Sequence, residues 1–376
     1  MSPGKTGRGV AILGAGMIGE VHRRAAILSG AEIVGVLASS EPRSRAVAGE
    51  WGTAAYANLD EVLADDRVDV VHVCTPNATH ASFAEAALRA GKHVICEKPL
   101  GISLDQAERM AAAAAESGLV ATVPFVYRYH PVVREIRDRR VAGEFGEFNL
   151  LHGSYLQDWM LDPDASGWRV EPELGGASRA FADIGSHWCD LVQWVSGETF
   201  VDVLAELSIA VPTRPAAAVR SFAGPAQGDG ERTEVRTEDS AVLLLRTGGG
   251  VLGSATISQV AAGRKNRLWF ELDGSRNSAV FDQENPEHAW LGGTEASRTV
   301  VRDIGSGSPE QRRLSVLPAG HAQGYAQCFE AFVADTYAAI DGSDPVGLPT
   351  FEDGLRSARM VDAVLRSASN ESWTKV

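Results

Sequence analysis

The chain has 376 residues, of which 44% are hydrophobic and 22% are charged, and its formal net charge is −14. This length exceeds what one hydrophobic core usually supports, so we expect two globular domains. The negative charge and the lack of a basic block argue against nucleic acid or a membrane surface as a partner. No stretch approaches the roughly 20 apolar residues of a membrane span.

The N-terminal sequence MSPGKTGRG lacks the apolar core of a secretory signal and leads directly into a strand-like run. We therefore expect a cytoplasmic protein. The cysteines are scattered without CxxC spacing, which favours buried free thiols in a reducing compartment over disulfides or zinc sites. They are Cys74, Cys96, Cys189 and Cys328.

Residues 1–125 alternate short apolar runs with helical patterns, which is typical of the βαβ units of a parallel sheet. One helix is expected to begin at Ser103, with Gln106 completing a capping box, and to end near Gly118. The pattern predicts a doubly wound, Rossmann-type dinucleotide-binding domain over residues 1–125. Its predicted strands are Val10–Leu13, Ile33–Ala38, Val68–Cys74, His93–Cys96 and Val120–Phe125.

Residues 126–376 change to alternating strand patterns, which we interpret as antiparallel strands of a substrate-binding and oligomerisation domain of the α+β class. Residues 211–238 are rich in Pro, Gly, Ala and charge and predict a long surface loop. A helical pattern over Phe351–Ala368 closes the chain, and this last helix could pack back towards the first domain. The predicted strands are Phe148–Tyr155, Ala241–Leu245, Val251–Ile257 and Leu268–Leu272.

A glycine fingerprint, GVAILGAGMIGEVH, places Gly14, Gly16 and Gly19 in G-x-G-x-x-G spacing directly after the first strand. The first glycine permits a tight turn, the second lets a pyrophosphate approach the backbone, and the third lets the helix pack against the strand. We expect this turn, with Met17 and Ile18, to bind the pyrophosphate of NAD or NADP. A purely structural turn is the alternative.

The second strand ends at LASSEPR, so Ser39 stands where a ribose-binding acid is expected about 20 residues past the fingerprint. A carboxylate there would repel a 2′-phosphate, whereas Ser39, Ser40 and Arg43 can donate hydrogen bonds to one. The sequence therefore slightly favours NADP over NAD. Arg43 could instead stack on adenine.

Glu97 and Lys98, in the motif CEKPL, follow the strand His93–Cys96 and so lie at the carboxyl edge of the sheet, where open α/β folds bind ligands. Pro99 biases Lys98 away from helical geometry, so its ammonium could point into the crevice. A solvated surface lysine is the alternative.

The segment ADIGSHWCDLVQW spaces Asp183, His187 and Asp190 so that a helix would present all of them on one face. An Asp four residues before a His can orient the imidazole for proton transfer near neutral pH. The alternatives are a hydrogen-bonded cluster on the helix surface, or a zinc site. We expect no metal, because no further His or Cys stands at ligand spacing.

Together, GxGxxG, EKPL and D-x-G-x-H-x-x-D resemble the family of glucose-fructose oxidoreductase, inositol dehydrogenase and MocA. Further matches are CTPNATH at residues 74–80, PFVYRYHP at 124–131 and FEDGLRSARMVDAVLRSA near the C-terminus. The segments GSYLQDWMLDPDASGWR and AAGRKNRLWFELDGSRNSAVF resemble the levoglucosan dehydrogenases of that family.

The resemblance implies a Rossmann domain followed by a domain with a large, mostly antiparallel open sheet, whose outer face forms a homodimer or homotetramer. It implies the catalytic residues Lys98, Asp183 and His187. The implied cofactor-binding residues, besides the glycine turn and residues 39–43, are Thr75, Pro76, Asn77, His80, Glu97, Lys98, Trp168 and Arg169. Aromatic rings and side-chain donors suit a sugar, which makes Trp168 and Arg169 candidates for substrate contact as well as for the nicotinamide, whereas Trp159 could instead belong to the core. The candidate substrate-binding residues are Tyr127, Arg128, Gln157, Trp159, Asp183 and His187.

These features predict an NAD(P)-dependent oxidoreductase that transfers a hydride between nicotinamide and a secondary hydroxyl of a sugar, anhydrosugar, glycoside or cyclitol, with a 3-keto sugar as one product. In this hypothesis His187 exchanges the hydroxyl proton, Asp183 orients it, and Lys98 binds the reacting oxygen. Alternatives are a reductase of the same fold acting on a biliverdin, dihydrodiol or nucleotide sugar, for which Arg214 or Arg220 could bind a diphosphate, and a non-catalytic NAD(P)-sensing protein.

Overall fold

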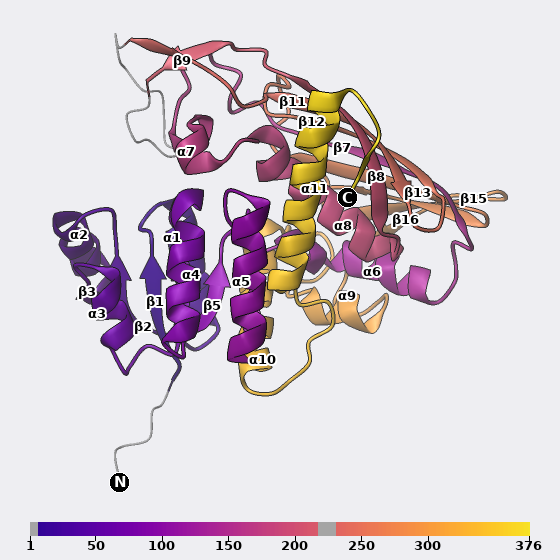
Figure 1. Ribbon diagram of the computed structural model, residues 1–376. Coiled ribbons are helices and arrows are strands. Elements are labelled where there is room, and N and C mark those ends of the chain that lie inside the picture. The colour runs from indigo at the N-terminus through magenta and orange to yellow at the C-terminus, as the bar shows by residue number, and fades with distance from the viewer. Residues whose placement is uncertain (1–6, 217–230) are drawn as a thin grey trace. The chain divides into compact units, whose positions relative to one another are not determined.

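The computed structural model describes residues 7–216 and 231–376 and divides into two units (Figure 1). The first unit comprises Met1–Pro124 and Phe329–Arg356, and the second comprises Phe125–Cys328 and Ser357–Val376. The segment Phe329–Arg356 joins the rest of the first unit through backbone contacts. Val123 N–H donates to Pro349 O (3.1 Å), and Thr122 forms a β-bridge with Thr350.

The sheet of the first unit has six parallel strands in the order β3-β2-β1-β4-β5-β6, so the order reverses between β1 and β4. This confirms the predicted doubly wound fold. Its central strands are fully buried, as parallel strands covered on both faces must be. The strands are β1 (Gly9–Leu13), β2 (Glu32–Leu37), β3 (Ala54–Ala55), β4 (Val70–Val73), β5 (His93–Cys96) and β6 (Ala121–Thr122), the last shorter than predicted.

The helices of the first unit begin and end where local signals predict. Ser103 accepts the N–H of Gln106 (3.3 Å), and Gly118 ends the helix at φ 64°. The Gln106 side chain accepts from Ile102 N–H (3.0 Å) rather than from the cap residue itself. The helices are α1 (Met17–Leu28), α2 (Glu41–Trp51), α3 (Leu59–Ala64), η1 (Asn77–Thr79), α4 (His80–Arg89), α5 (Leu104–Ser117) and most of α10 (Tyr325–Ile340).

The second unit is built on a nine-stranded sheet in the order β16-β15-β14-β13-β7-β12-β11-β8-β17. Its neighbouring strands are antiparallel except β7 and β12, which are parallel. This confirms the predicted mostly antiparallel sheet. The parallel pair could not be identified beforehand, because alternation reveals a strand but not the direction of its partner. The strands are β7 (Phe148–Leu156), β8 (Phe200–Ser208), β11 (Ser240–Thr247), β12 (Leu252–Ser258), β13 (Arg267–Gly274), β14 (Asn277–Asp282), β15 (His288–Gly293), β16 (Arg298–Val301) and β17 (Thr374–Lys375).

One face of this sheet carries the core of the second unit. Leu243, Leu245 and Phe270 point inward and are fully buried, and Trp188 of α8 packs with them. On the opposite face Val242 and its neighbours are exposed. Figure 1 shows α6 and α8 beside the strands of this sheet. The helical segments are η2 (Val126–Tyr129), α6 (Pro131–Val141), η3 (Trp168–Val170), α7 (Pro172–Gly175), η4 (Phe181–Gly185), α8 (Ser186–Ser196), α9 (Pro309–Leu314) and α11 (Phe351–Asn370).

The predicted surface loop over residues 211–238 needs correction. Its described ends form a two-stranded antiparallel sheet of β9 (Thr213–Pro215) and β10 (Arg232–Glu234). Arg214 is fully buried and donates to the carbonyls of Met160 and Ala165 (2.7 and 2.9 Å), so its guanidinium is not available for a diphosphate. Arg220 lies outside the described residues.

Two further sequence expectations concern the cysteines and the helices. All four cysteines are buried and free, as predicted. None of the helices within the described ranges combines the length and the apolar character that a membrane span requires.

Candidate active site

The glycine turn between β1 and α1 has the geometry that a dinucleotide requires. Gly14 has φ +100°, and a Cβ there would lie 2.4 Å from the Cys74 carbonyl oxygen. A Cβ on Gly19 would lie 2.0 Å from the Gly14 carbonyl oxygen, so the helix packs closely on the turn. Gly16 faces open space, and no side chain caps the first turn of α1, where Met17 and Ile18 lie. The N-terminal N–H groups of α1 therefore fit a pyrophosphate.

At the end of β2, Ser39, Ser40 and Arg43 are all exposed. The Ser40 hydroxyl accepts the N–H of Arg43 (3.4 Å) and so caps α2. The carboxylate of Glu41 pairs with Arg45 within the same helix. The start of α2 thus offers hydroxyl and guanidinium donors, with no carboxylate at position 39.

The loop after β4 carries Thr75, Pro76, Asn77 and His80. Thr75 and Pro76 are partly exposed, whereas Asn77 and His80 are buried. The ring nitrogens of His80 lie 2.9 Å from the carbonyl oxygens of Thr75 and Pro99. Burial lowers the pKa of His80. The fully buried ring therefore holds the β4 and β5 loops together, and its predicted contact with the cofactor stays a prediction.

Glu97 and Lys98 follow β5, as predicted. Glu97 is buried, and its Oε1 lies 3.0 Å from His22 Nε2 while its Oε2 accepts the Lys98 N–H (3.2 Å). Burial acts to raise the pKa of Glu97, but the hydrogen bond and charge of His22 and the charge of Lys98 lower it overall. The Glu97 carboxylate therefore faces the interior and supports the backbone of Lys98, whose side chain is partly exposed.

A buried hydrogen-bonded series extends from Glu97 into the first unit. His22 Nδ1 lies 3.1 Å from His72 Nδ1, and His72 Nε2 lies 3.0 Å from the Tyr337 hydroxyl. The Glu97 carboxylate can only accept, so His22 donates to it from Nε2. Burial and the charge of His22 hold the pKa of His72 well below its usual range, so this ring is neutral.

Asp183 and His187 lie in the second unit. Asp183 belongs to the π-helical turn η4 and His187 to the following α8, so the predicted single α-helix is interrupted where Asp183 stands. Gln259 Nε2 donates to Asp183 Oδ2 (2.7 Å), and Arg169 Nε lies 3.9 Å from Asp183 Oδ1. π-Helical turns occur frequently at functional sites.

Aromatic rings surround the imidazole of His187. The rings of Tyr127, Phe125 and Tyr155 lie 5.0, 5.6 and 6.4 Å from it, measured between centroids. His187 is 8% exposed, so these rings enclose most of the residue.

Asp190 does not join Asp183 and His187. Its carboxylate accepts from both the Nε (2.8 Å) and an Nη of Arg128, and both side chains are buried. This geometry makes Arg128 a structural partner of α8, and its role in substrate binding stays a prediction. Within residues 7–216 and 231–376, metal-ligand spacing is found only for His152, Glu271 and Asp273 on β7 and β13.

The other candidate substrate residues form one polar series. Trp159 Nε1 donates to Gln157 Oε1 (3.0 Å), and Gln157 Nε2 donates to Asn266 Oδ1 (2.9 Å). Asn266 also accepts from the Tyr155 hydroxyl (2.7 Å) and donates to the Tyr127 hydroxyl (3.2 Å). The two tyrosine hydroxyls are 2.5 Å apart, and burial raises the pKa of Tyr127 to about 12.

Sequence reasoning missed Tyr155, Asn266, Gln259 and Arg179 at this site. Tyr155, Asn266 and Gln259 stand within or next to predicted strands, and a polar residue at the end of a buried strand was the available signal. Trp168 and Arg169, expected at the cofactor, stack on each other with the guanidinium 4.3 Å from the ring centre. Arg169 therefore contributes to the surroundings of Asp183.

Comparisons with sequence families match most of the chain. Residues 8–125 match a profile described as an oxidoreductase family with an NAD-binding Rossmann fold, and residues 133–280 match the GFO/IDH/MocA C-terminal domain. The levoglucosan dehydrogenase of Pseudarthrobacter phenanthrenivorans is 34% identical over 326 residues, which cover 84% of this chain and 82% of that protein. Inositol 2-dehydrogenase of Rhizobium meliloti is 25% identical over 364 residues, or 96% of each chain.

Solved structures of oxidoreductases match almost the whole chain. An oxidoreductase domain protein from Kribbella flavida is 32% identical with a TM-score of 0.89 and covers 99% of this chain and 100% of its own. A levoglucosan dehydrogenase in complex with NADH and L-sorbose has a TM-score of 0.89 at 28% identity, covering 99% of each chain. An inositol dehydrogenase homologue from Azotobacter vinelandii with NAD+ has a TM-score of 0.84 at 25% identity, covering 99% of this chain and 98% of its own.

Proposed function

Because this chain belongs to the GFO/IDH/MocA family of NAD(P)-dependent oxidoreductases, we propose that it oxidises or forms a secondary hydroxyl of a sugar, anhydrosugar, glycoside or cyclitol. The observation that carries this proposal is the imidazole of His187, four residues after Asp183, which lies against the rings of Tyr127 and Tyr155, two members of a hydrogen-bonded polar series. A sugar ring presents an apolar face and several hydroxyls, and such a site can contact both. A keto sugar is the expected oxidised product.

The proposed reaction divides the substrate's hydrogen atoms between two acceptors. The bound nicotinamide supplies the acceptor for the hydride that leaves the carbinol carbon. His187 takes the hydroxyl proton as the C=O bond forms, and it returns that proton in the reverse direction. Asp183 orients the imidazole and the substrate. Lys98 donates a hydrogen bond to the reacting oxygen and stabilises its developing negative charge.

For the cofactor, we propose that NADP is accepted at least as well as NAD. The support is the set of exposed donors Ser39, Ser40 and Arg43 at the start of α2. A D-xylose 1-dehydrogenase of Haloferax volcanii, 33% identical over 157 residues, carries NADP(+) in its name, while two solved relatives are described with NADH or NAD+.

We further propose that the chain forms a homodimer or homotetramer through the outer face of its nine-stranded sheet. Val242, Leu244 and Leu252 are 54%, 48% and 56% exposed on the adjacent strands β11 and β12. A contiguous exposed apolar row of this kind is typical of an interface.

The experiment that tests the proposed function is a panel of sugars, anhydrosugars, glycosides and inositols with both cofactors, followed by the absorbance of reduced nicotinamide. We expect turnover with at least one polyol class. Tight cofactor binding without turnover on any polyol would instead favour a sensing role.

Lys98→Met tests the mechanism directly. We expect cofactor binding to persist and kcat to fall on the order of 100-fold or more, because a polar contact to the developing charge is removed. Lys375→Met, at an exposed lysine paired with Asp202, is the matched control and should retain its activity. Near-normal kcat in Lys98→Met would remove this lysine from the mechanism.

A further inference from the structure

The Asp183 carboxylate is held by a buried glutamine. Gln259 is fully buried, and its Nε2 donates to Asp183 Oδ2 (2.7 Å). The backbone of Gln259 is fixed as well, because its N–H donates to Asp239 O (3.0 Å) and its carbonyl accepts from Met160 N–H (3.1 Å). The side chain therefore meets Asp183 from a backbone that has little freedom to move.

An arginine determines which end of this amide faces Asp183. A glutamine can present either its oxygen or its NH2 group to a neighbour, and the hydrogen-bond partners decide between them. Arg179 Nη1 lies 2.7 Å from Gln259 Oε1. A guanidinium can only donate, so the amide oxygen must face Arg179 and the NH2 group must face Asp183. That arrangement suits an ionised carboxylate, which can only accept.

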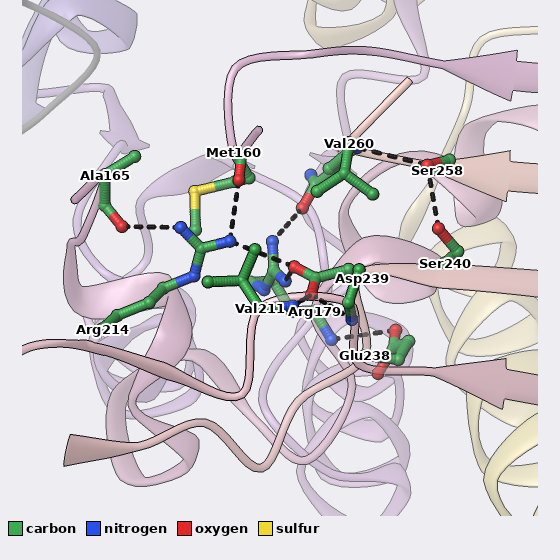
Figure 2. Close-up of polar contacts among 12 residues, drawn as sticks. Met160, Ala165, Arg179, Val211, Arg214, Glu238, Asp239, Ser240, Ser258 and Val260 are labelled. Atoms are coloured by element: carbon green, nitrogen blue, oxygen red, sulfur yellow. Dashed lines mark hydrogen bonds and ion pairs between the residues drawn. The ribbon is translucent and has the colours of Figure 1, made fainter. Parts of the chain in front are cut away.

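Arg179 is itself anchored, as Figure 2 shows. Its Nη2 bonds Asp239 Oδ1, and both side chains are almost completely buried. The same oxygen lies 3.3 Å from Arg214 Nη2, while Asp239 Oδ2 accepts the N–H groups of Ala210 and Val211 (2.8 and 2.9 Å). Both oxygens of Asp239 are thus engaged, so the Arg179 fork is fixed in one plane.

The backbone of the π-helical turn is fixed by the neighbouring residue, Glu238. Its Oε1 accepts the N–H groups of Arg179 (3.1 Å) and Phe181 (2.8 Å) and the Ser178 hydroxyl (2.8 Å). Asp183 N–H in turn donates to the Arg179 carbonyl (2.8 Å). The backbone and the carboxylate of Asp183 are therefore held from the same two strand ends, those of β11 and β12.

We propose that Gln259 and Arg179 are positioning residues that hold the ionised Asp183 carboxylate in the orientation its catalytic role requires. Without the amide donor, the carboxylate would turn towards its cationic neighbour Arg169, whose Nε lies 3.9 Å from Oδ1. This inference rests on the proposed function, in which Asp183 orients His187 and the substrate. It assigns to the buried Arg179–Asp239–Arg214 cluster a role in catalysis through Asp183.

A double-mutant cycle tests whether Gln259 acts through Asp183. We expect Gln259→Leu to lower kcat/KM about 10- to 100-fold, as misplacement of a reacting group does, with the cofactor Kd unchanged. In an Asp183→Asn background the same substitution should change kcat/KM less than about threefold. Gln311→Leu is the matched control, because Gln311 is a fully buried glutamine of α9 whose amide contacts the backbone of Asp303 and Ser306.

Gln259→Glu gives a pH readout that a purely structural role would not produce. The introduced carboxyl has nearly the same shape and faces Arg179 on one side and Asp183 on the other, with Arg169 beyond Asp183. When both carboxyls are ionised they repel each other, whereas one shared proton restores a donor to Asp183. We expect kcat/KM relative to wild type to rise as pH is lowered from about 8 to about 6.

The outcomes separate this inference from the proposed function. If Asp183→Asn alone leaves kcat/KM close to wild type, the proposed role of Asp183 fails. If Asp183→Asn is impaired while Gln259→Leu matches Gln311→Leu, the positioning inference fails alone. Additive losses in the double mutant, or a pH-independent ratio for Gln259→Glu, also overturn it.

Discussion

At the scale of single residues, the candidate catalytic side chains of each unit depend on side chains that support them. Glu97 holds the backbone of Lys98, and Gln259 holds the carboxylate of Asp183. Each supporting group is buried and has a donor or acceptor partner whose chemistry allows only one direction for the hydrogen bond. Burial makes such arrangements costly to disrupt, because an unsatisfied buried polar group cannot recover its interaction with water.

The series Tyr337–His72–His22–Glu97 allows a graded prediction of stability. His22→Leu leaves the buried Glu97 carboxylate without its imidazole donor and should lower the free energy of unfolding by about 3 kcal/mol. His22→Gln retains an amide donor near the former Nε2 position and should recover part of that loss. Tyr337→Phe removes only a neutral hydroxyl at the far end and should cost about 1 kcal/mol. Urea unfolding measures all three, and equal losses would contradict the larger cost expected at the carboxylate end of the series.

At the scale of elements, strand and helix signals that lie close together in the sequence predicted the first unit well. The glycine turn, the Ser103 cap and the position of Lys98 after β5 all depend on neighbours within a few residues. The parallel pairing of β7 with β12 could not be predicted, because these strands lie about a hundred residues apart and alternation carries no direction. The π-helical turn at Asp183 was missed for a related reason: Glu238, which precedes the distant strand β11, holds its backbone.

The start of α2 yields a prediction about the cofactor. Ser39→Asp places a carboxylate where a 2′-phosphate would bind and should shift preference towards NAD by roughly 1 to 3 kcal/mol. Ser39→Asn, which has nearly the same shape without the charge, is the control and should shift the preference much less. Arg43→Ala should weaken the binding of NADP more than the binding of NAD. Values of kcat/KM for both cofactors decide, and a wild-type preference for NAD above roughly tenfold, or about 1.4 kcal/mol, would sink this interpretation.

At the scale of the whole molecule, the residues that sequence reasoning missed are those joined over long separations. Gln259 meets Asp183 across 76 positions, and Arg179 meets Asp239 across 60. Arg214 was expected in a surface loop because charge and Pro normally indicate exposure, yet its Nη1 and Nη2 groups donate to backbone carbonyls in the interior. A buried cluster of charged residues such as this one leaves no repeating pattern in the sequence. It becomes visible only in the folded structure.

Buried histidines make the stability of the molecule depend on pH. Burial lowers the pKa of His72, of His80 and, to about 4, of His130. A histidine in the unfolded chain titrates near about 6.5, so below that pH the unfolded chain binds more protons than the folded one. The free energy of unfolding should therefore be highest above about pH 7 and decrease as the pH falls from about 6.5 towards 4.

Glu238 opposes this trend, because burial raises its pKa and the folded chain keeps its proton to higher pH than the unfolded chain does. The histidines outnumber it, so the net change should follow them. Urea unfolding at several pH values measures the slope, and His130→Gln should flatten it. A free energy of unfolding that stays constant from about pH 7.5 to about pH 5 would contradict this account.

The exposed row on the outer face of the nine-stranded sheet gives a prediction about assembly. Leu244→Asp places a charge among Val242 and Leu252 and should convert the oligomer to monomers, because burying an unpaired charge costs several kcal/mol. Light scattering after size-exclusion chromatography measures the mass. Leu28→Asp is the matched control, since Leu28 is an exposed leucine of α1. An unchanged mass for Leu244→Asp would place the interface elsewhere, and a monomeric wild type would refute self-association.

The segment Phe329–Arg356, which completes the first unit, affects how the protein folds during its synthesis on the ribosome. Three early residues find their partners in this segment: His72 contacts Tyr337, Thr122 contacts Thr336, and Arg8 contacts Asp341. Residues 125–328 must be translated before these contacts can form. At about 5 to 20 residues per second, this delay lasts on the order of 10 to 40 s. The nascent cofactor unit therefore emerges with an open edge at β6, and most of the second unit is translated before the first can close, while its last segment, Ser357–Val376, follows afterwards.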